Sequence, residues 1–198
     1  MRTLLVIISL VIGFQLSAQA TKQRATLYFK NGEVKKAYAR ISGYNVRYSD
    51  KAFKGKEKKV NYKELDHIEL RNGDKLIHVY YKQVKGKKKP RLMELIVDGK
   101  AKLYRILDVY DGAQMLPFKN MRNNKNYSGE KNLNTRYFLE SKDGDGTVFR
   151  IKKNFEKEAK KYFSDCEKLV KLIGTKGFRK KDLLDIVLFY NEECEETE

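Results

Sequence analysis

The chain has 198 residues, and its 43 Lys and Arg against 26 Asp and Glu give a formal net charge of +17. A hydrophobic content of 41% with only two prolines excludes an intrinsically disordered protein. The length allows one sizeable domain or two small ones.

The first 20 residues are typical of a secretory signal peptide. Arg2 precedes an apolar run at 4–14, and Ala-Gln-Ala at 18–20 supplies the small residues that signal peptidase selects. An uncleaved membrane anchor is disfavoured, because the run has about 11 residues and a spanning helix needs about 20. We expect cleavage after Ala20, a mature chain that begins at Thr21 and has no transmembrane span, and a periplasmic or secreted location.

Residues 21–110 are expected to form an antiparallel β domain, a small barrel or sandwich of short strands. Apolar and polar residues alternate through this region, which is the period of a strand with one buried face. Asn-Gly pairs at 31–32 and 72–73 and an Asp-Gly pair at 98–99 each separate two such runs. These pairs predict tight hairpin turns.

The remainder of the chain divides into four predicted segments. The Asn- and Lys-rich stretch 111–134 is expected to be a connecting loop, and 135–153 a further β-hairpin. Apolar residues then recur at steps of three and four, which predicts a helical hairpin over 154–194. Residues 195–198 form an acidic tail. The predicted fold class is therefore α+β.

The only two cysteines, Cys166 and Cys194, lie on the apolar stripes of the two predicted helices. Export favours a disulfide between them, because disulfides persist in oxidising compartments. A metal site is disfavoured, since both histidines are far upstream and neither cysteine has a C-x-x-C partner. Two buried free thiols remain an alternative. In a symmetric hairpin, the second helix would have to fray near Asn191 for the bond to form.

Two basic runs are candidates for a surface that binds polyanions. They contribute the residues Lys54, Lys56, Lys58, Lys59, Lys85, Lys87, Lys88, Lys89 and Arg91. One interpretation is that they are solvated hairpin tips that keep an exported protein soluble. The other is a cationic surface for anionic polysaccharide or lipopolysaccharide, while export argues against intracellular nucleic acid. Other envelope proteins are further candidate partners.

No pattern in the sequence indicates a catalytic, cofactor or metal site. Asp143 and Asp145 resemble the start of a calcium loop, but position twelve is Asn154 instead of Glu, which favours a glycine-rich turn. His67 and His78 lie in strand-like runs without a recognisable nucleophile motif. We therefore expect an exported, non-catalytic envelope binding or interaction module without a cofactor. The alternative is a small periplasmic hydrolase with its site at the strand–helix junction.

Four segments resemble a group of uncharacterised secreted proteins that is common in Bacteroidetes. They read TLYFKNGEV, VDGKAKLYRIL, YFSDCEKLVKLI and LFYNEEC, and the most specific are those with Asp165-Cys166 and Tyr190-Asn191. The resemblance spans most of the mature chain and implies a periplasmic or surface setting. It implies no activity and no catalytic residue.

Overall fold

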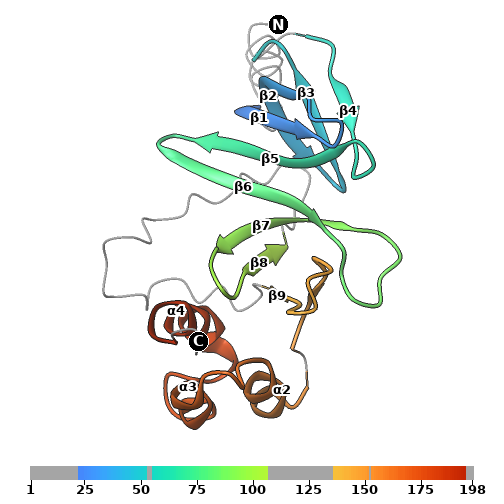
Figure 1. Cartoon of the computed structure of the whole chain (residues 1–198). Helices are drawn as coiled ribbons and strands as arrows, with labels where there is room; N and C mark the ends of the chain where they lie inside the picture. The colour runs from blue at the N-terminus through green and yellow to red at the C-terminus, as the bar shows by residue number, and fades with distance from the viewer. Residues whose placement is uncertain (1–21, 53–54, 107–135, 152, 195–198) are drawn as a thin grey trace, which may run out of the picture.

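The structure, a computed structural model, describes residues 22–52, 55–106, 136–151 and 153–194. Within these ranges ten strands form one antiparallel sheet, and short helices lie at its C-terminal end (Figure 1). The predicted α+β class is confirmed. The predicted signal peptide, connecting loop and acidic tail lie outside the described residues. None of the described helices is long and apolar enough to cross a bilayer.

The strands are arranged in the spatial order β10-β9-β8-β7-β6-β5-β1-β2-β3-β4. Most neighbours in this order are consecutive in the chain, but β1 also pairs with β5, which brings distant segments together. The strand bounds are β1 Gln23–Phe29, β2 Val34–Ser42, β3 Asn45–Ser49, β4 Lys58–Val60, β5 Leu65–Asn72, β6 Lys75–Lys82, β7 Arg91–Val97, β8 Leu103–Ile106, β9 Tyr137–Glu140 and β10 Val148–Phe149.

The three predicted hairpins are confirmed, although the connection at 98–99 is not a tight turn but spans residues 98–102. The pairs at 31–32, 72–73 and 98–99 join or border β1 and β2, β5 and β6, and β7 and β8, and each of these strand pairs is hydrogen-bonded. Gly32 and Gly73 have φ angles of 87° and 61°. Only glycine adopts such angles without a steric cost, so these residues set the turns and thereby the register of the strands.

The N-terminal strands bury one face and expose the other. On β1, Ala25 and Leu27 belong to a buried cluster with residues of β2 to β7, while Arg24 and Thr26 point to the opposite side. This alternation follows from the two-residue period of a strand. β4 lies at the end of the sheet and pairs with β3, so the strands do not close into a barrel. Of the two predicted forms, a small barrel or a sandwich, the barrel is therefore not closed in the described residues.

The hairpin predicted at 135–153 is present, but it belongs to the same sheet as the N-terminal strands. Its first strand, β9, pairs with β8, with Phe138 opposite Tyr104. Its second strand, β10, also forms a bridge between Val148 and Val84. The described residues thus contain one continuous sheet that crosses the expected boundary at residue 110.

The C-terminal helices are α2 Phe155–Tyr162, α3 Glu167–Leu172 and α4 Leu183–Glu193, with a 3₁₀ turn, η1, at Lys180–Asp182. The predicted first helix is therefore wrong in one respect: it is interrupted between Tyr162 and Glu167. Ser164 and Asp165 occupy this break. Their short polar side chains compete for backbone hydrogen bonds and favour turns over helix interiors.

The helices and the C-terminal strands share a buried core. Phe163, Leu169, Ile186 and Tyr190 are each fully buried there, in one cluster with residues of β7, β8 and β9. Leu139 on β9 is part of the same cluster. The apolar stripes that predicted the helices are the surfaces that cover this face of the sheet.

The predicted disulfide between Cys166 and Cys194 is present, with Cα atoms 5.6 Å apart. The expected fraying of the last helix near Asn191 is wrong, since α4 continues to Glu193. Two features remove the need for it: Cys166 stands at the start of the short α3, and ten residues separate α3 from α4. The hairpin is consequently asymmetric. A disulfide fits an exported protein, because it is stable in oxidising compartments.

Candidate anion-binding site

A row of four side chains crosses the outward-facing side of β2, β1, β5 and β6. In the strand pairing, Arg24 stands opposite Tyr38 on one side and opposite Arg71 on the other. Arg71 in turn stands opposite Leu76. Directly opposed residues point to the same face of a sheet, with their Cβ atoms about 5 Å apart. Two arginines therefore project side by side from this surface.

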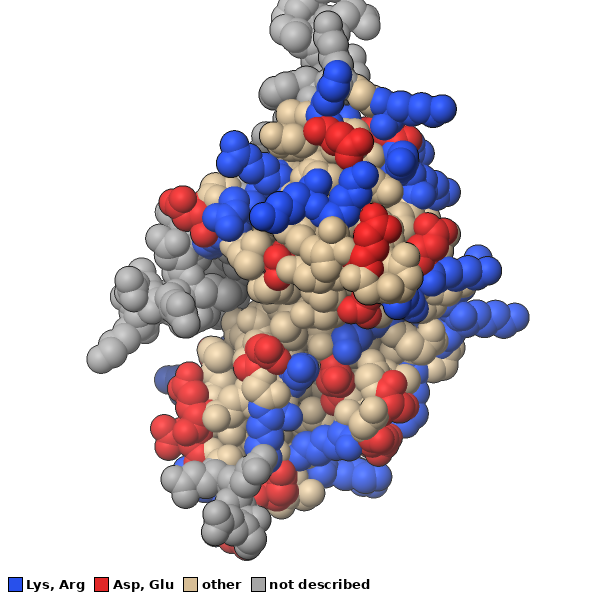
Figure 2. Space-filling model, turned by 45° about the horizontal axis from the view of Figure 1, so that its top comes forward, with Lys and Arg blue, Asp and Glu red and all other residues tan. Residues whose placement is uncertain are grey.

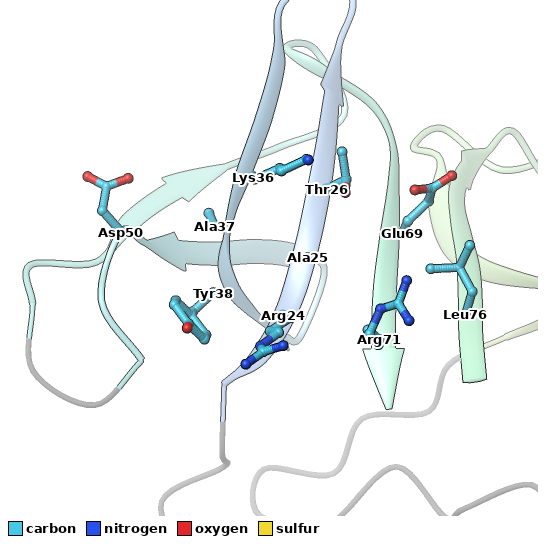
Figure 3. A pocket seen from close by; sticks show the side chains of 10 residues that line it. All are labelled: Arg24, Ala25, Thr26, Lys36, Ala37, Tyr38, Asp50, Glu69, Arg71 and Leu76. Atoms are coloured by element: carbon cyan, nitrogen blue, oxygen red, sulfur yellow. The ribbon is translucent and has the colours of Figure 1, made fainter. Parts of the chain in front are cut away.

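These side chains line a shallow hollow of ≈ 410 Å³. Figure 3 shows Tyr38, Arg24, Arg71 and Leu76 along one side of it. A second row, formed by Lys36, Thr26 and Glu69, lies beside the first. Asp50, which follows β3, completes one end. The volume is within the range of small-ligand sites, about 300–1,000 Å³.

The cations of the hollow are unpaired, whereas its carboxylates have partners. Arg24, Lys36 and Arg71 have no ion pair or hydrogen bond to any residue that the structure describes. Asp50 lies 3.1 Å from Lys35 Nζ.

The remaining carboxylate, Glu69, lies 3.7 Å from His78 Nδ1. Its negative charge is also one cause of the raised pKa of the neighbouring Tyr28, after burial. The hollow therefore presents unpaired positive charge.

A second basic cluster lies on the same face, over β2, β3 and β4. Arg40 stands opposite Arg47, and Arg47 stands opposite Lys59. The single carboxylate between them belongs to Glu57, which accepts hydrogen bonds of 3.0 Å from both Nε and Nη2 of Arg40. Lys22 Nζ lies 3.5 Å from the same carboxylate and Arg47 Nη1 3.8 Å.

The hydrogen bonds from Arg40 are the main reason why the pKa of Glu57 is lowered. Glu57 thus lies within ion-pair distance of three cations, Lys22, Arg40 and Arg47. Figure 2 shows Lys and Arg side chains in a band over the N-terminal strands.

Aromatic rings border the hollow on the side away from the arginine row. Tyr28, His67 and Tyr80 stand opposite one another across β1, β5 and β6. The ring centroids of Tyr28 and His67 are 4.1 Å apart, and those of His67 and Tyr80 are 5.0 Å apart, both in stacked geometry. These three rings therefore stack on one another. Tyr38, in contrast, has no ring contact or hydrogen bond to a described residue.

The basic residues predicted from the sequence are divided between distant strands. Lys58 and Lys59 belong to β4, the strand at one end of the sheet, and Lys56 shortly precedes it. Lys54 lies outside the described residues. The exposed residues of the β6–β7 connection are Lys85, Lys87, Lys88 and Lys89. The backbone N–H of Lys85 donates to Val148 O of β10, at the other end of the strand order.

Arg91 begins β7, and its guanidinium lies 5.4 Å from the centre of the Tyr44 ring. Tyr44 is 63% exposed and stands in the turn between β2 and β3. The strands of the two basic runs are not hydrogen-bonded neighbours, although Arg91 of the second run contacts the turn between β2 and β3. Arg24 and Arg71, which have no partner among the described residues and which the sequence did not indicate, lie on β1 and β5 in the middle of the strand order.

The strand–helix junction contains a tight polar network. Lys142 Nζ lies 2.9 Å from Asp165 Oδ1 and donates to the Tyr190 hydroxyl at 2.9 Å. The Tyr190 hydroxyl also donates to Asp165 Oδ2, and Lys100 Nζ lies 3.4 Å from that oxygen. Burial acts to raise the pKa of Asp165, but the hydrogen bonds from Tyr190 and Lys142 outweigh it and hold the pKa at about 2.

The neighbouring Asn191 side chain binds both the N–H and the carbonyl of Ala101, at 2.8 and 3.0 Å. These contacts fasten α4 to the start of β8. The polar groups of the junction thus bind one another and join the helices to the sheet.

The glycine-rich turn between β9 and β10 uses its carboxylates internally. Asp145 accepts hydrogen bonds from the backbone N–H and the hydroxyl of Thr147, at 2.9 and 2.8 Å. Asp143 accepts one from the Ser141 hydroxyl at 2.7 Å. In the described part of the chain, no three His, Cys, Asp or Glu side chains gather closely enough to hold a metal ion.

No protein-family model, curated protein or solved structure matches this chain.

Proposed function

We propose that this protein is an exported, non-catalytic envelope module that binds anionic ligands on the outer face of β1, β2, β5 and β6. The observation that carries the proposal is the direct opposition of Arg24 and Arg71 without a carboxylate partner in the described residues. Like charges that stand directly opposite in a sheet are destabilising. An anionic ligand would convert this unfavourable contact into a binding site.

Guanidinium groups are well suited to this task. Each presents donors in a planar fork that matches carboxylate, sulfate and phosphate oxygens. A guanidinium is also more weakly hydrated than the ammonium of lysine, so it loses its bound water at a lower cost when it contacts a ligand. Arg40–Arg47 and Arg47–Lys59 repeat the opposition of cations nearby on the same face. Together they would extend the surface for a longer polyanion.

The lysines of the β6–β7 connection would have a different role in this proposal. Their side chains are exposed and distant in strand order from the second basic cluster. Exposed charges act beyond contact only within the screening length, about 8 Å at physiological ionic strength. They would therefore accelerate the approach of a polyanion at low salt more than they stabilise the bound state.

A salt titration of heparin binding tests the proposal with the mature chain that begins at Thr21. The double variant Arg24→Gln/Arg71→Gln should bind more weakly and should lower the slope of log affinity against log salt by about one unit per lost contact. The matched control Lys157→Gln/Lys161→Gln removes the same charge from exposed positions of α2. Equal effects in both variants, or no binding by the unaltered protein at physiological salt, would contradict the proposal.

The loop lysines need their own variant. Lys87→Gln/Lys88→Gln/Lys89→Gln should slow association at low salt and leave affinity at physiological salt nearly unchanged. If this variant instead loses more affinity than the arginine variant, the binding surface is the β6–β7 connection, and the proposed position of the site is wrong.

A further inference from the structure

We infer that the hollow binds one unit of an acidic saccharide, that is, a sugar bearing a carboxylate, sulfate or phosphate group. This inference rests on the proposed function and makes it more specific, because it excludes polyanions that lack hydroxyl donors. It depends on the combination of three chemistries in the hollow: unpaired guanidinium groups, carboxylates, and apolar side chains.

The paired arginines provide the anion subsite. Arg24 and Arg71 occupy one rung of the β1–β5 pairing and lack described partners, so both forks are available to one ligand group. Lys36, on the neighbouring row, adds a third cation at the rim. A tetrahedral or carboxylate anion has enough oxygens to accept from two guanidinium groups at once.

The two carboxylates of the hollow distinguish between classes of polyanion. The Asp50 side chain is 72% exposed, and that of Glu69 is 21% exposed. Polyphosphate and a nucleic-acid backbone offer such groups little except like charge, and like-charge contacts are unfavourable. Sugar hydroxyls, in contrast, donate hydrogen bonds to ionised carboxylates, which are purely acceptors.

The ends of the arginine row are apolar. Tyr38 is partly buried, and its ring has no stacking partner or hydrogen bond among the described residues. Leu76, at the other end, is 45% exposed. An amphipathic aromatic ring gives a flat surface for the C–H face of a sugar. The resulting arrangement, apolar platforms around a few polar groups in a concave surface, is typical of small-ligand sites.

Competition between ligands of matched charge tests this inference. A short oligogalacturonate should bind the mature protein, a neutral oligosaccharide of the same length should not, and a linear polyphosphate of equal charge should bind more weakly. A sulfated oligosaccharide tests whether the anionic group must be a carboxylate. Comparable binding of the oligogalacturonate and the sulfated oligosaccharide supports one anion subsite for both groups.

Two variants separate the sugar contacts from general electrostatics. Tyr38→Ala should weaken oligogalacturonate binding roughly tenfold, as expected for the loss of one stacking contact, and leave polyphosphate binding unchanged. Asp50→Asn should weaken oligogalacturonate binding and strengthen polyphosphate binding, since it replaces one acceptor oxygen with an amide donor and removes the negative charge. This opposite response is the decisive result.

Two outcomes would overturn the inference while leaving the proposed function standing. One is tighter binding of polyphosphate than of oligogalacturonate. The other is strengthening of both ligands by Asp50→Asn, which would indicate a simple electrostatic surface. If neither ligand binds and heparin does not bind either, the proposed function fails together with the inference.

Discussion

The two ends of the sheet treat positive charge differently. At the C-terminal end, two partly buried cations each have a carboxylate: Lys82 with Glu140 at 2.7 Å and Arg105 with Glu94 at 2.6 Å. The more exposed Lys142 also has one, Asp165 at 2.9 Å. On the outer face of the N-terminal strands, Arg24, Lys36 and Arg71 have no such partner among the described residues.

The difference follows from solvent exposure. Burying an unpaired charge is costly, so the covered end of the sheet requires pairing. Glu94, only 7% exposed, shows this balance: burial raises its pKa, and Arg105 opposes the rise. Exposed cations need no partner for folding, but folding does not explain why two of them stand directly opposite each other. The proposed anionic ligand would account for that arrangement.

The largest expected difference between the two ends concerns core packing. Phe163 is fully buried and packs against Tyr190 with ring centroids 4.9 Å apart. Phe163→Ala should lower the free energy of unfolding by about 3–5 kcal/mol, measured by urea denaturation. Tyr38→Ala, in the hollow, should cost far less, because its ring lacks described partners. Similar losses in the two variants would remove the distinction between a structural end and a binding end.

The disulfide should be the next largest contributor at the C-terminal end. Cys166 and Cys194 are 28 positions apart, and closing a loop of this length restricts the unfolded chain by about 3–4 kcal/mol. The double variant Cys166→Ser/Cys194→Ser should lose a comparable free energy of unfolding. Reduction of the unaltered protein should give the same loss. Unchanged stability after confirmed reduction would contradict this prediction.

Much of the fold was predictable because the turn residues and the alternation of apolar residues indicate the same strands. The turns at 31–32, 72–73 and 98–99 need glycine at fixed places, and strand alternation marks the buried face. The closure of the strands was not predictable, because it depends on how far β4 curls towards other strands. The break at Ser164-Asp165 was also missed, since the apolar spacing continues through it.

A moderate effect is expected from pH at the strand–helix junction. The pKa of Asp165 is about 2, against 3.8 in the unfolded chain, so its contribution to stability is present above about pH 4 and is lost as pH falls towards 2. The side chain is 39% exposed, and solvent screening therefore limits this contribution to about 1 kcal/mol.

Urea midpoints measured from pH 5 to pH 2 test this assignment. Asp165→Asn should be less stable than the unaltered protein at pH 5 and should lose less stability on acidification. Glu57, Glu140 and Asp145 also have lowered pKa values, so some acid sensitivity should remain. A variant with an unchanged profile would show that the junction does not depend on this carboxylate.

The candidate site was less predictable than the fold, for a reason that lies in strand register. Runs such as Lys87 to Lys89 are visible in any short window of sequence, whereas Arg24 and Arg71 come together only in one pairing of β1 with β5. A slip of one residue would place Arg24 opposite Leu70 and turn one of the two side chains to the other face. Sequence alone does not specify that register.

The smallest expected effect is the one that most directly separates a binding role from a structural one. If Arg24 and Arg71 repel each other in the free protein, Arg71→Gln should raise the free energy of unfolding by a few tenths of a kcal/mol while it weakens anion binding. Lys157→Gln, at an exposed position of α2, should change neither quantity. Added salt should reduce the gain in stability from Arg71→Gln, since screening weakens the repulsion that the substitution removes.

A variant that is more stable but binds less well fits a residue that is kept for its ligand, because selection for stability alone would remove that residue. A destabilised variant would mean that Arg71 supports the sheet, and the argument from opposed charges would then fail.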